Sequence, residues 1–145
     1  MKHLLFVIVI LLVACSSSNK KVENKQYEEQ AQRVTIIRDS WGIPHIYGKT
    51  DADAVFGLMY AQCEESFERV ERNYLEILGR MSELEGETYL YQDLKMKIIY
   101  DTSAAIADYH KAPAWLKKLL HAFADGINYY LYKNPTVKAR IVTLF

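Results

Sequence analysis

The sequence predicts an α+β fold in which an N-terminal β-hairpin precedes a mainly helical segment. Two observations lead to this fold class. A β-branched run, VTIIR at residues 34–38, is followed by turn residues and a second extended stretch. Beyond residue 50, apolar residues recur at steps of three and four, which places them on one face of a helix.

The chain begins with a segment that resembles a bacterial lipoprotein signal. A short basic start precedes the apolar run Leu4–Ala14, which is about half as long as the roughly twenty residues that a membrane-spanning helix needs. This run leads directly to Cys15, as in a lipobox. The resemblance implies a signal peptide over residues 1–14, cleavage before Cys15, and lipid on its thiol and amino group. The protein would then be anchored to a membrane of the bacterial cell envelope, on the periplasmic or the outer side. The alternative is ordinary secretion with an incidental cysteine.

Lipid on Cys15 would leave Cys63 without a disulfide partner. Cys63 lies in an apolar helical pattern, so we expect a small buried side chain there rather than a catalytic thiol. Residues 15–32 carry almost no apolar side chains and cannot bury enough surface to fold alone. This stretch is predicted to be a polar tether between the lipid and the folded part, which begins at residue 33.

The chain contains 18 basic and 18 acidic residues, so its formal net charge is zero. Proteins that bind nucleic acid through its phosphates generally carry a basic surface. The charge balance therefore argues against a nucleic-acid partner and against a polybasic contact with a membrane.

The first predicted structural element is the hairpin. Val34–Arg38 form the first strand, and a turn follows in which Gly42 can take a positive φ. Ile43–Tyr47 resume the extended pattern, and Pro44 suits the start or the edge of a strand. Because a two-stranded hairpin alone is at best marginally stable, its bulky side chains need a covering layer. These side chains are Trp41, Ile43, Ile46 and Tyr47.

A single long amphipathic helix is predicted after the hairpin, from about Asp53 to Met81. Thr50 or Asp51 is its candidate N-cap. Glu65 and Arg69 stand four residues apart, in the order that favours an ion pair on a helix surface. Such a pair is typical of a solvated face rather than of a functional site.

Two further helical elements are predicted after a stop at Gly86. A weakly periodic one runs from about Gln92 to Tyr109, and a strongly periodic one starts at Pro113 and ends at Asn134. Gly126 lies inside the last helix, where glycine costs about 1 kcal/mol relative to alanine. A close contact with another element would explain this glycine, and chance drift explains it equally well.

The sequence alone reveals no catalytic residue and no set of metal ligands. It lacks the GxSxG, HExxH and CxxC patterns and a glycine-rich phosphate loop. His45 is the histidine in the most suggestive context, beside Pro44 in the hairpin. We expect it to make a structural hydrogen bond rather than to act as a base.

An ordered series of short motifs runs through the hairpin and the helices that follow. The motifs are Arg38-Asp39, Gly42-Ile43-Pro44-His45-Ile46, Asp53-Ala54, Phe56-Gly57-Leu58-Met59-Tyr60-Ala61, Gly79-Arg80 with Glu83, Gly86, and Phe123–Leu131. Together they resemble the start of the α chain of the penicillin acylase family, over residues 34–135. Two positions depart from the family pattern. The family often has glycine at Met59 and usually has Asp-Arg at Glu65-Ser66, which puts local packing and a helix salt bridge in doubt.

The resemblance implies a four-layer αββα core of the N-terminal nucleophile hydrolase type. Residues 33–145 would be the incomplete N-terminal part of an α chain, whose β chain comes from the same precursor. The family's nucleophile is the first residue of the β chain, usually serine, so this fragment is expected to be inactive. The motif residues in this chain are expected to be structural: Arg38, Asp39, Gly42, Pro44, His45, Tyr60, Gly79, Arg80, Glu83 and Gly86.

The resemblance also implies a substrate class and a metal. Family members hydrolyse carbon–nitrogen bonds in linear amides, and their substrates are acyl-amide small molecules such as penicillins and acyl-homoserine lactones. Many members bind calcium, but the calcium ligands cannot be identified in this chain.

The alternative is a non-enzymatic protein, a lipid-anchored helical scaffold or binding protein of the cell envelope. It would require the chain to fold alone and to expose a polar surface. In the acylase interpretation, a sheet would cover the bulky side chains of the hairpin, and residues outside this sequence would largely supply that sheet.

Overall fold

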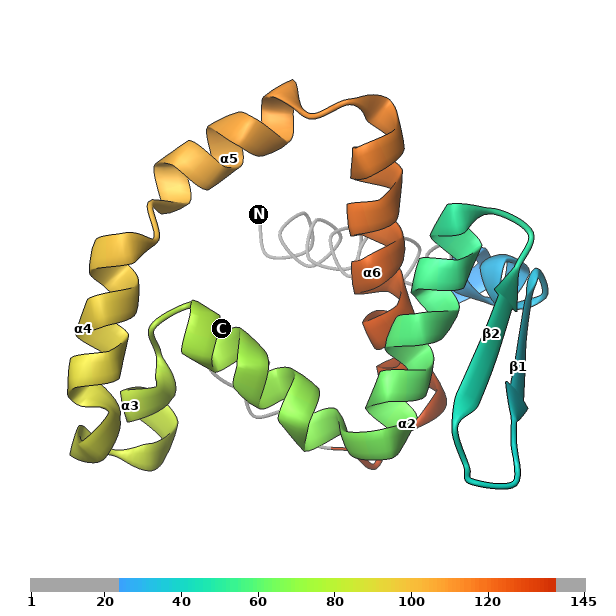
Figure 1. Ribbon diagram of the computed structural model, residues 1–145, viewed down its shortest axis with the longest axis horizontal. Helices are drawn as coiled ribbons and strands as arrows, with labels where there is room; N and C mark the ends of the chain where they lie inside the picture. The colour runs from blue at the N-terminus through green and yellow to red at the C-terminus, as the bar shows by residue number, and fades with distance from the viewer. Residues whose placement is uncertain (1–23, 138–145) are drawn as a thin grey trace, which may run out of the picture.

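The computed structural model describes residues 24–137, which form a hairpin followed by a series of helices (Figure 1). The predicted signal peptide, Cys15 and the first part of the predicted tether lie outside these residues. Between residues 24 and 137, no helix is both long and apolar enough to cross a membrane.

The predicted hairpin is confirmed. Strand β1, Val34–Arg38, pairs antiparallel with strand β2, Pro44–Gly48, and Arg38 stands opposite Pro44 at the turn end. Pro44 therefore opens its strand, the position in which its missing N–H does not interrupt the ladder.

One face of the hairpin packs on the long helix that follows. Val34, Ile36 and Ile46 are half-buried on this face. The two elements meet at Gly57, where a Cβ atom would lie 2.5 Å from Val34 Cγ1 and 2.8 Å from Ile46 Cγ2. The prediction that Ile46 needs cover from outside this sequence is therefore wrong, because the strand register turns it toward the helix. The other bulky hairpin residues remain open, with Trp41 88%, Ile43 56% and Tyr47 60% exposed.

Helix α2, Asp51–Ile77, begins as predicted at Thr50, whose hydroxyl accepts a hydrogen bond from the Asp53 N–H at 3.2 Å. It is not one continuous helix. Ser66 leaves the helical region with φ −164° and ψ 89°, and its hydroxyl accepts a bond from the Arg69 N–H at 3.3 Å. The serine thus caps the second half of α2 as an N-cap would, which accounts for a kink that apolar periodicity does not reveal.

The long helix also ends earlier than predicted. Its C-cap is Leu78, and Gly79 follows with φ +61°. A separate short helix, α3 over Met81–Glu85, then ends at Gly86 with φ +84°, before a 3-10 turn over Glu87–Tyr89. Gly79, with its positive φ, therefore divides what the apolar pattern joined, and the predicted stop at Gly86 is confirmed.

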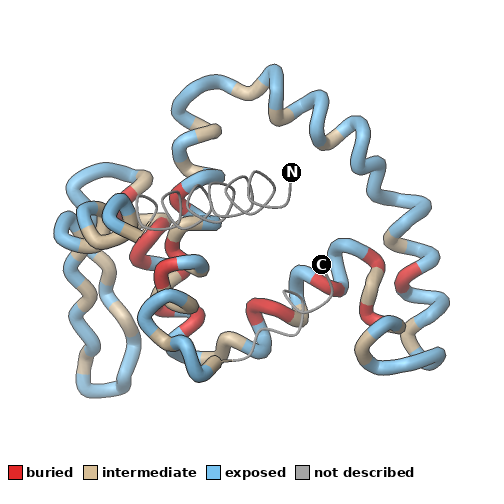
Figure 2. Tube along the Cα trace, turned by 180° about the vertical axis from the view of Figure 1, so that it is seen from behind, coloured by how far each residue is buried: buried red, intermediate tan, exposed pale blue. Residues whose placement is uncertain are grey.

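The element predicted from Gln92 to Tyr109 is two helices, α4 over Leu90–Ile99 and α5 over Thr102–Lys111. They separate at Asp101, whose carboxylate accepts bonds from the N–H groups at the start of α5 and caps it. The two helices form an arc that leaves the rest of the molecule and returns to α6 (Figure 1). Most of this arc is exposed (Figure 2).

Helix α6, Ala114–Lys133, follows Pro113 and ends at Asn134, as predicted. It packs along α2, and many of the buried residues lie where these two helices meet, whereas a second group lies around the end of α2, α3 and α4 (Figure 2). Gly126 lies at their closest approach, where a Cβ atom would be 2.4 Å from the Phe56 carbonyl oxygen. Of the two explanations for this glycine, close helix contact is confirmed.

Residues 24–31 differ from the predicted polar tether, because they form a helix that packs on the core. Tyr27 and Ala31 stand four residues apart, so they share one helix face, and that face contacts the cluster around Phe56 and Tyr129. Glu28 accepts a hydrogen bond from the Tyr129 hydroxyl at 3.2 Å. Two apolar residues at helical spacing are enough to dock a segment that could not fold alone.

Candidate functional site

The hairpin turn is built around the carboxylate of Asp39. One of its oxygens accepts bonds from the N–H groups of Trp41 and Ile43, both at 2.9 Å, and the other lies 3.2 Å from His45 Nε2. Gly42 completes the turn at φ +82°, a conformation that side chains disfavour. Burial alone would raise the pKa of Asp39, but the bonds from Ile43, His45 and Trp41 outweigh it and lower the pKa.

His45 is therefore placed as predicted, as a partner of Asp39 at a structural turn. Its ring is half-exposed and bound to the turn carboxylate. This arrangement fixes the turn.

Arg38 joins the turn to helix α2. Its guanidinium donates to the Gly42 carbonyl at 3.0 Å and binds Glu64 and Glu65 on α2. Glu65 thus pairs across the fold instead of with Arg69, because the kink at Ser66 breaks the helical spacing between them. The pair couples the hairpin to the helix one residue before the kink.

A second buried connection lies at the start of α2. Asp53, only 1% exposed, accepts bonds from the Arg33 guanidinium and from the Thr50 hydroxyl, the latter at 2.9 Å. Burial raises the pKa of this carboxyl, but the bonds from Arg33 and Thr50 prevail and lower it. The sequence marks Asp53 only as part of a motif, and the partner, Arg33, stands before the hairpin where no pattern points to it.

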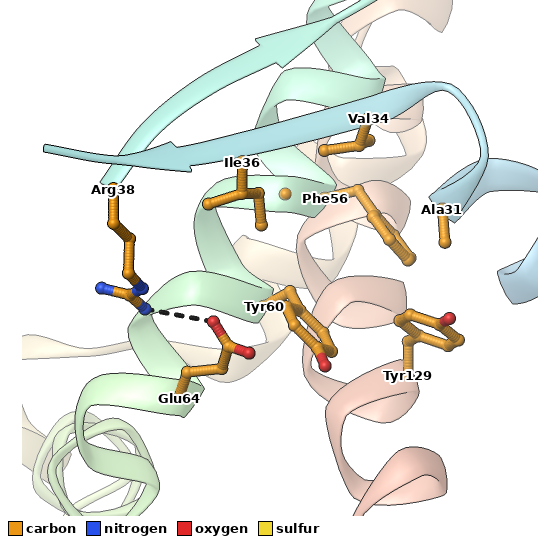
Figure 3. Close-up of a pocket in the computed structure, with 9 residues that line it drawn as sticks. Ala31, Val34, Ile36, Arg38, Phe56, Tyr60, Glu64 and Tyr129 are labelled. Carbon is orange, nitrogen blue, oxygen red and sulfur yellow. Dashed lines mark hydrogen bonds and ion pairs between the residues drawn. The ribbon is translucent and has the colours of Figure 1, made fainter. Parts of the chain in front are cut away.

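Between the hairpin and the helices lies a cleft of about 440 Å³ (Figure 3). The ion pair between Arg38 and Glu64, at 3.1 Å, stands at one end, and aromatic rings of Phe56, Tyr60 and Tyr129 form a wall. The remaining lining is small or aliphatic and comes from Ala31, Val34, Ile36 and Gly57.

The cleft offers apolar surface and no reactive nucleophile. Burial and the nearby charge of Glu64 raise the pKa of the Tyr60 hydroxyl. Burial and a bond to Glu28 raise that of Tyr129 to about 12. Both hydroxyls are thus held protonated at neutral pH.

The other predicted motif residues meet at the far end of α2. Arg80 and Glu83 form a double hydrogen bond at 2.9 and 2.7 Å on the surface of α3. At Gly79 a Cβ atom would lie 2.8 Å from the Asp93 carbonyl oxygen, so this glycine lets α4 approach. Gly86 ends α3, as described above.

Asp93 is the residue here that sequence reasoning missed. Its side chain is 3% exposed and accepts bonds from the N–H groups of Met81 and Ser82, at 3.0 and 2.6 Å, and from the Ser82 hydroxyl. Burial opposes its ionisation, but the bonds from Ser82 and Met81 lower its pKa. It caps α3 from a different helix, a role that appears in the sequence only as an isolated acid.

Cys63 is buried as predicted, at 1% exposure, and burial raises the pKa of its thiol to about 11. A thiol so held is not a nucleophile at neutral pH. Residues 24–137 contain no group of three or more His, Cys, Asp or Glu side chains that could hold a metal ion. The buried carboxylates Asp53 and Asp93 are bound to protein donors, so these residues do not fit a calcium site.

Comparison with known proteins shows the family to which this chain is similar. The penicillin amidase family model matches residues 33–142. The acyl-homoserine lactone acylase QuiP of Pseudomonas aeruginosa is 32% identical over 103 residues, which are 71% of this chain and 12% of that protein. The penicillin acylase 2 proenzyme of Pseudomonas sp. strain SE83 is 29% identical over 98 residues, 68% of this chain and 13% of the relative.

A solved structure agrees with these sequence matches. The thermostable penicillin G acylase from Alcaligenes faecalis superposes with a TM-score of 0.65 at 17% identity, over 76% of this chain and 60% of the other. At this identity the likeness shows the shared fold. The chain spans about one eighth of the length of the curated relatives it matches. From the match over residues 33–142, the chain belongs to the penicillin amidase family.

Proposed function

We propose that this chain supplies the N-terminal part of the α chain of an acylase that hydrolyses carbon–nitrogen bonds in linear amides. The observation that carries the proposal is the family match over residues 33–142, which includes the whole hairpin framework. Relatives named as acyl-homoserine lactone acylase and penicillin acylase indicate the substrate class, an acyl group joined through an amide. In this proposal the nucleophile would be the first residue of a β chain cut from the same precursor.

In this proposal the residues described here position other parts of the enzyme. The inner face of the hairpin is fixed to α2 at Gly57 and through Arg38. Its outer face presents Trp41, Ile43 and Tyr47 with more than half of each side chain exposed. Leaving a large apolar side chain exposed forgoes about 1.5 to 3 kcal/mol, so a strand or sheet of the remaining polypeptide would gain by covering them.

The proposal extends to the metal and the location of the enzyme. Because the buried carboxylates Asp53 and Asp93 are bound to protein donors, and residues 24–137 contain no cluster of three or more candidate ligands, we propose that any calcium site draws on residues outside this range. We also propose that lipid on Cys15 holds the protein in the bacterial envelope. The basis is the sequence pattern around that residue, which lies outside the described residues.

A chimera tests the proposed activity. Residues 33–137 of this chain would replace the matching segment of the Pseudomonas aeruginosa QuiP acylase, and hydrolysis of an acyl-homoserine lactone would be followed by release of homoserine lactone. We expect self-cleavage into two chains and turnover. The matched control carries Gly57→Val, which forces α2 and the hairpin apart and should abolish both.

A chimera that folds and cleaves itself yet hydrolyses neither acyl-homoserine lactones nor penicillins would contradict the proposed activity. Activity that persists in QuiP lacking the segment altogether would also contradict it, because the framework would then position nothing that catalysis requires.

A further inference from the structure

The junction of α5 and α6 concentrates positive charge in a chain whose formal net charge is zero. The sixteen residues 109–124, YHKAPAWLKKLLHAFA, contain three lysines and two histidines and no acidic residue. Asp108 and Asp125 stand immediately outside this stretch. Although the whole chain is neutral, residues 109–124 therefore carry a local excess of basic residues.

Exposed aromatic surface lies beside this charge. Trp115, in the first turn of α6, is 63% exposed, and it is followed three residues later by Lys118, which places both on neighbouring parts of the helix surface. Lys111, at the end of α5, and Lys118 are both exposed. Within residues 24–137, neither of these two lysines is paired with a carboxylate.

Contacts within the junction hold its geometry. Lys117 Nζ donates to the His110 carbonyl at 2.9 Å and lies 5.4 Å from the centre of the Tyr109 ring. The Tyr109 hydroxyl and His121 Nε2 share a hydrogen bond of 2.9 Å. These bonds tie the end of α5 to α6, so the charged groups form a fixed corner rather than a loose tail.

The position of the corner keeps it apart from the features described above. In Figure 1 it stands at the opposite end of the molecule from the hairpin turn. In Figure 2 the chain around it is mostly exposed. The aromatic and basic groups there contribute little to the packing of α2 on α6, so their exposure needs another explanation.

We propose that this α5–α6 corner, made of Lys111, Trp115, Lys117 and Lys118, is a contact site for an anionic membrane surface. Lysines near such a surface bind lipid phosphates, and tryptophan is the side chain that prefers the boundary between headgroups and acyl chains. Charge alone would also suit an acidic protein, but an exposed tryptophan beside lysines favours the membrane. The inference does not depend on the proposed acylase activity.

A peripheral contact of this kind would be weak alone. It would add to the anchoring that the lipid proposed on Cys15 supplies. None of the helices in residues 24–137 can cross a membrane, so the contact would be made at the surface.

Vesicle binding tests the inference with the full chain carrying Cys15→Ala, which removes the proposed lipid. Flotation would compare vesicles of phosphatidylcholine alone with vesicles that also contain phosphatidylglycerol. All variants carry the same residues 1–14, so a difference in binding between them reports on the corner. We expect Lys111→Glu with Lys118→Glu to weaken binding to the anionic vesicles at least about 25-fold, since each lysine contributes about fivefold.

The matched control is Lys49→Glu with Lys95→Glu, which makes the same change in net charge at exposed positions elsewhere. It should change binding by less than about threefold, because charges away from the surface are screened. A Trp41→Phe background leaves Trp115 as the single tryptophan, and its emission should shift to the blue on anionic vesicles.

Three results would overturn the inference. One is equal binding to both kinds of vesicle, and another is equal loss in the control and the corner variants. The third is unchanged Trp115 emission on anionic vesicles while polyglutamate binds with the same lysine dependence, which would assign the corner to an acidic protein.

Discussion

Replacing Gly126 with alanine sets two opposing effects against each other at the contact between α2 and α6. In an isolated helix, alanine is better than glycine by about 0.8 to 1 kcal/mol. In this structure the new methyl group would lie 2.4 Å from the Phe56 carbonyl oxygen and 3.0 Å from Met59 Cβ. The first of these neighbours is backbone, so it cannot turn aside as a flexible side chain can.

The structure predicts that the steric effect prevails. To reach an ordinary contact distance the two helices must separate by roughly 1 Å, and a gap of that size loses a quarter to a half of each dispersion contact across the interface. Overpacking of this kind costs about 1 to 3 kcal/mol. After the gain in helix propensity, the net loss is about 0 to 2 kcal/mol. Rings of Phe56 and Tyr129, 5.5 Å apart, are among the contacts that would loosen.

Urea titration of the full chain, followed by far-UV circular dichroism, measures whether Gly126→Ala lowers or raises the free energy of unfolding. For a slope of about 2 kcal/mol per molar urea, the midpoint should fall by up to about 1 M. Asn128→Ala is the control in the same helix, because its side chain is exposed and the substitution should raise stability by a few tenths of a kcal/mol. If Gly126→Ala raises the midpoint as the control does, the helices do not meet as closely as described here.

Three further predictions concern single side chains. Asp93→Asn should lower the urea midpoint at neutral pH, because it weakens the cap of α3. Folding lowers the pKa of Asp93, so the midpoint difference between wild type and variant should be complete above the ordinary pKa of 3.8. It should disappear as the pH falls through the lower pKa of the folded state. An unchanged difference at low pH would refute this account. In a Cys15→Ala background, Cys63 should not react with a thiol reagent at pH 8 until urea unfolds the chain, since its pKa is about 11; rapid native labelling would contradict its burial. Cys15→Ala should release the protein from bacterial membranes into the soluble fraction, and retention after a high-salt wash would show that lipid is not the anchor.

The hairpin shows which part of the fold the sequence can predict. A β-branched run, a turn glycine and a proline at the start of the second strand are local signals, and each has a local effect on the backbone. They placed β1 within its observed bounds and β2 within one residue of them. These local signals do not indicate which face of the hairpin meets α2, so the sequence does not predict that α2 covers Ile46.

The kink and the cap show what the sequence could not reveal. Apolar residues continue at helical spacing on both sides of Ser66, so periodicity predicts one helix, and the break depends on one hydroxyl bond to the Arg69 N–H. Asp93 caps a helix that begins twelve residues earlier in the chain. Both features depend on pairs of groups that meet only after folding. The motif glycines are easier to interpret from the sequence than the kink or the cap. A positive φ or a close approach of another element generally requires glycine.

Helix α4 carries its apolar residues on the side opposite to the one expected of a surface helix. Its fully buried residue is Asp93, which caps α3, whereas most of its apolar residues are exposed. Leu90, Leu94 and Ile98 recur every four residues and lie in one row along the helix, with exposed fractions of 46%, 50% and 86%. A soluble helix gains stability by burying such a row, so α4 is placed by its polar contact with α3 rather than by apolar burial. The hairpin has the same division between an inner face bound to α2 and an outer aromatic face that is open. The hairpin and α4 are therefore two separate elements, each held from one side only, in a chain that spans about one eighth of its relatives' length.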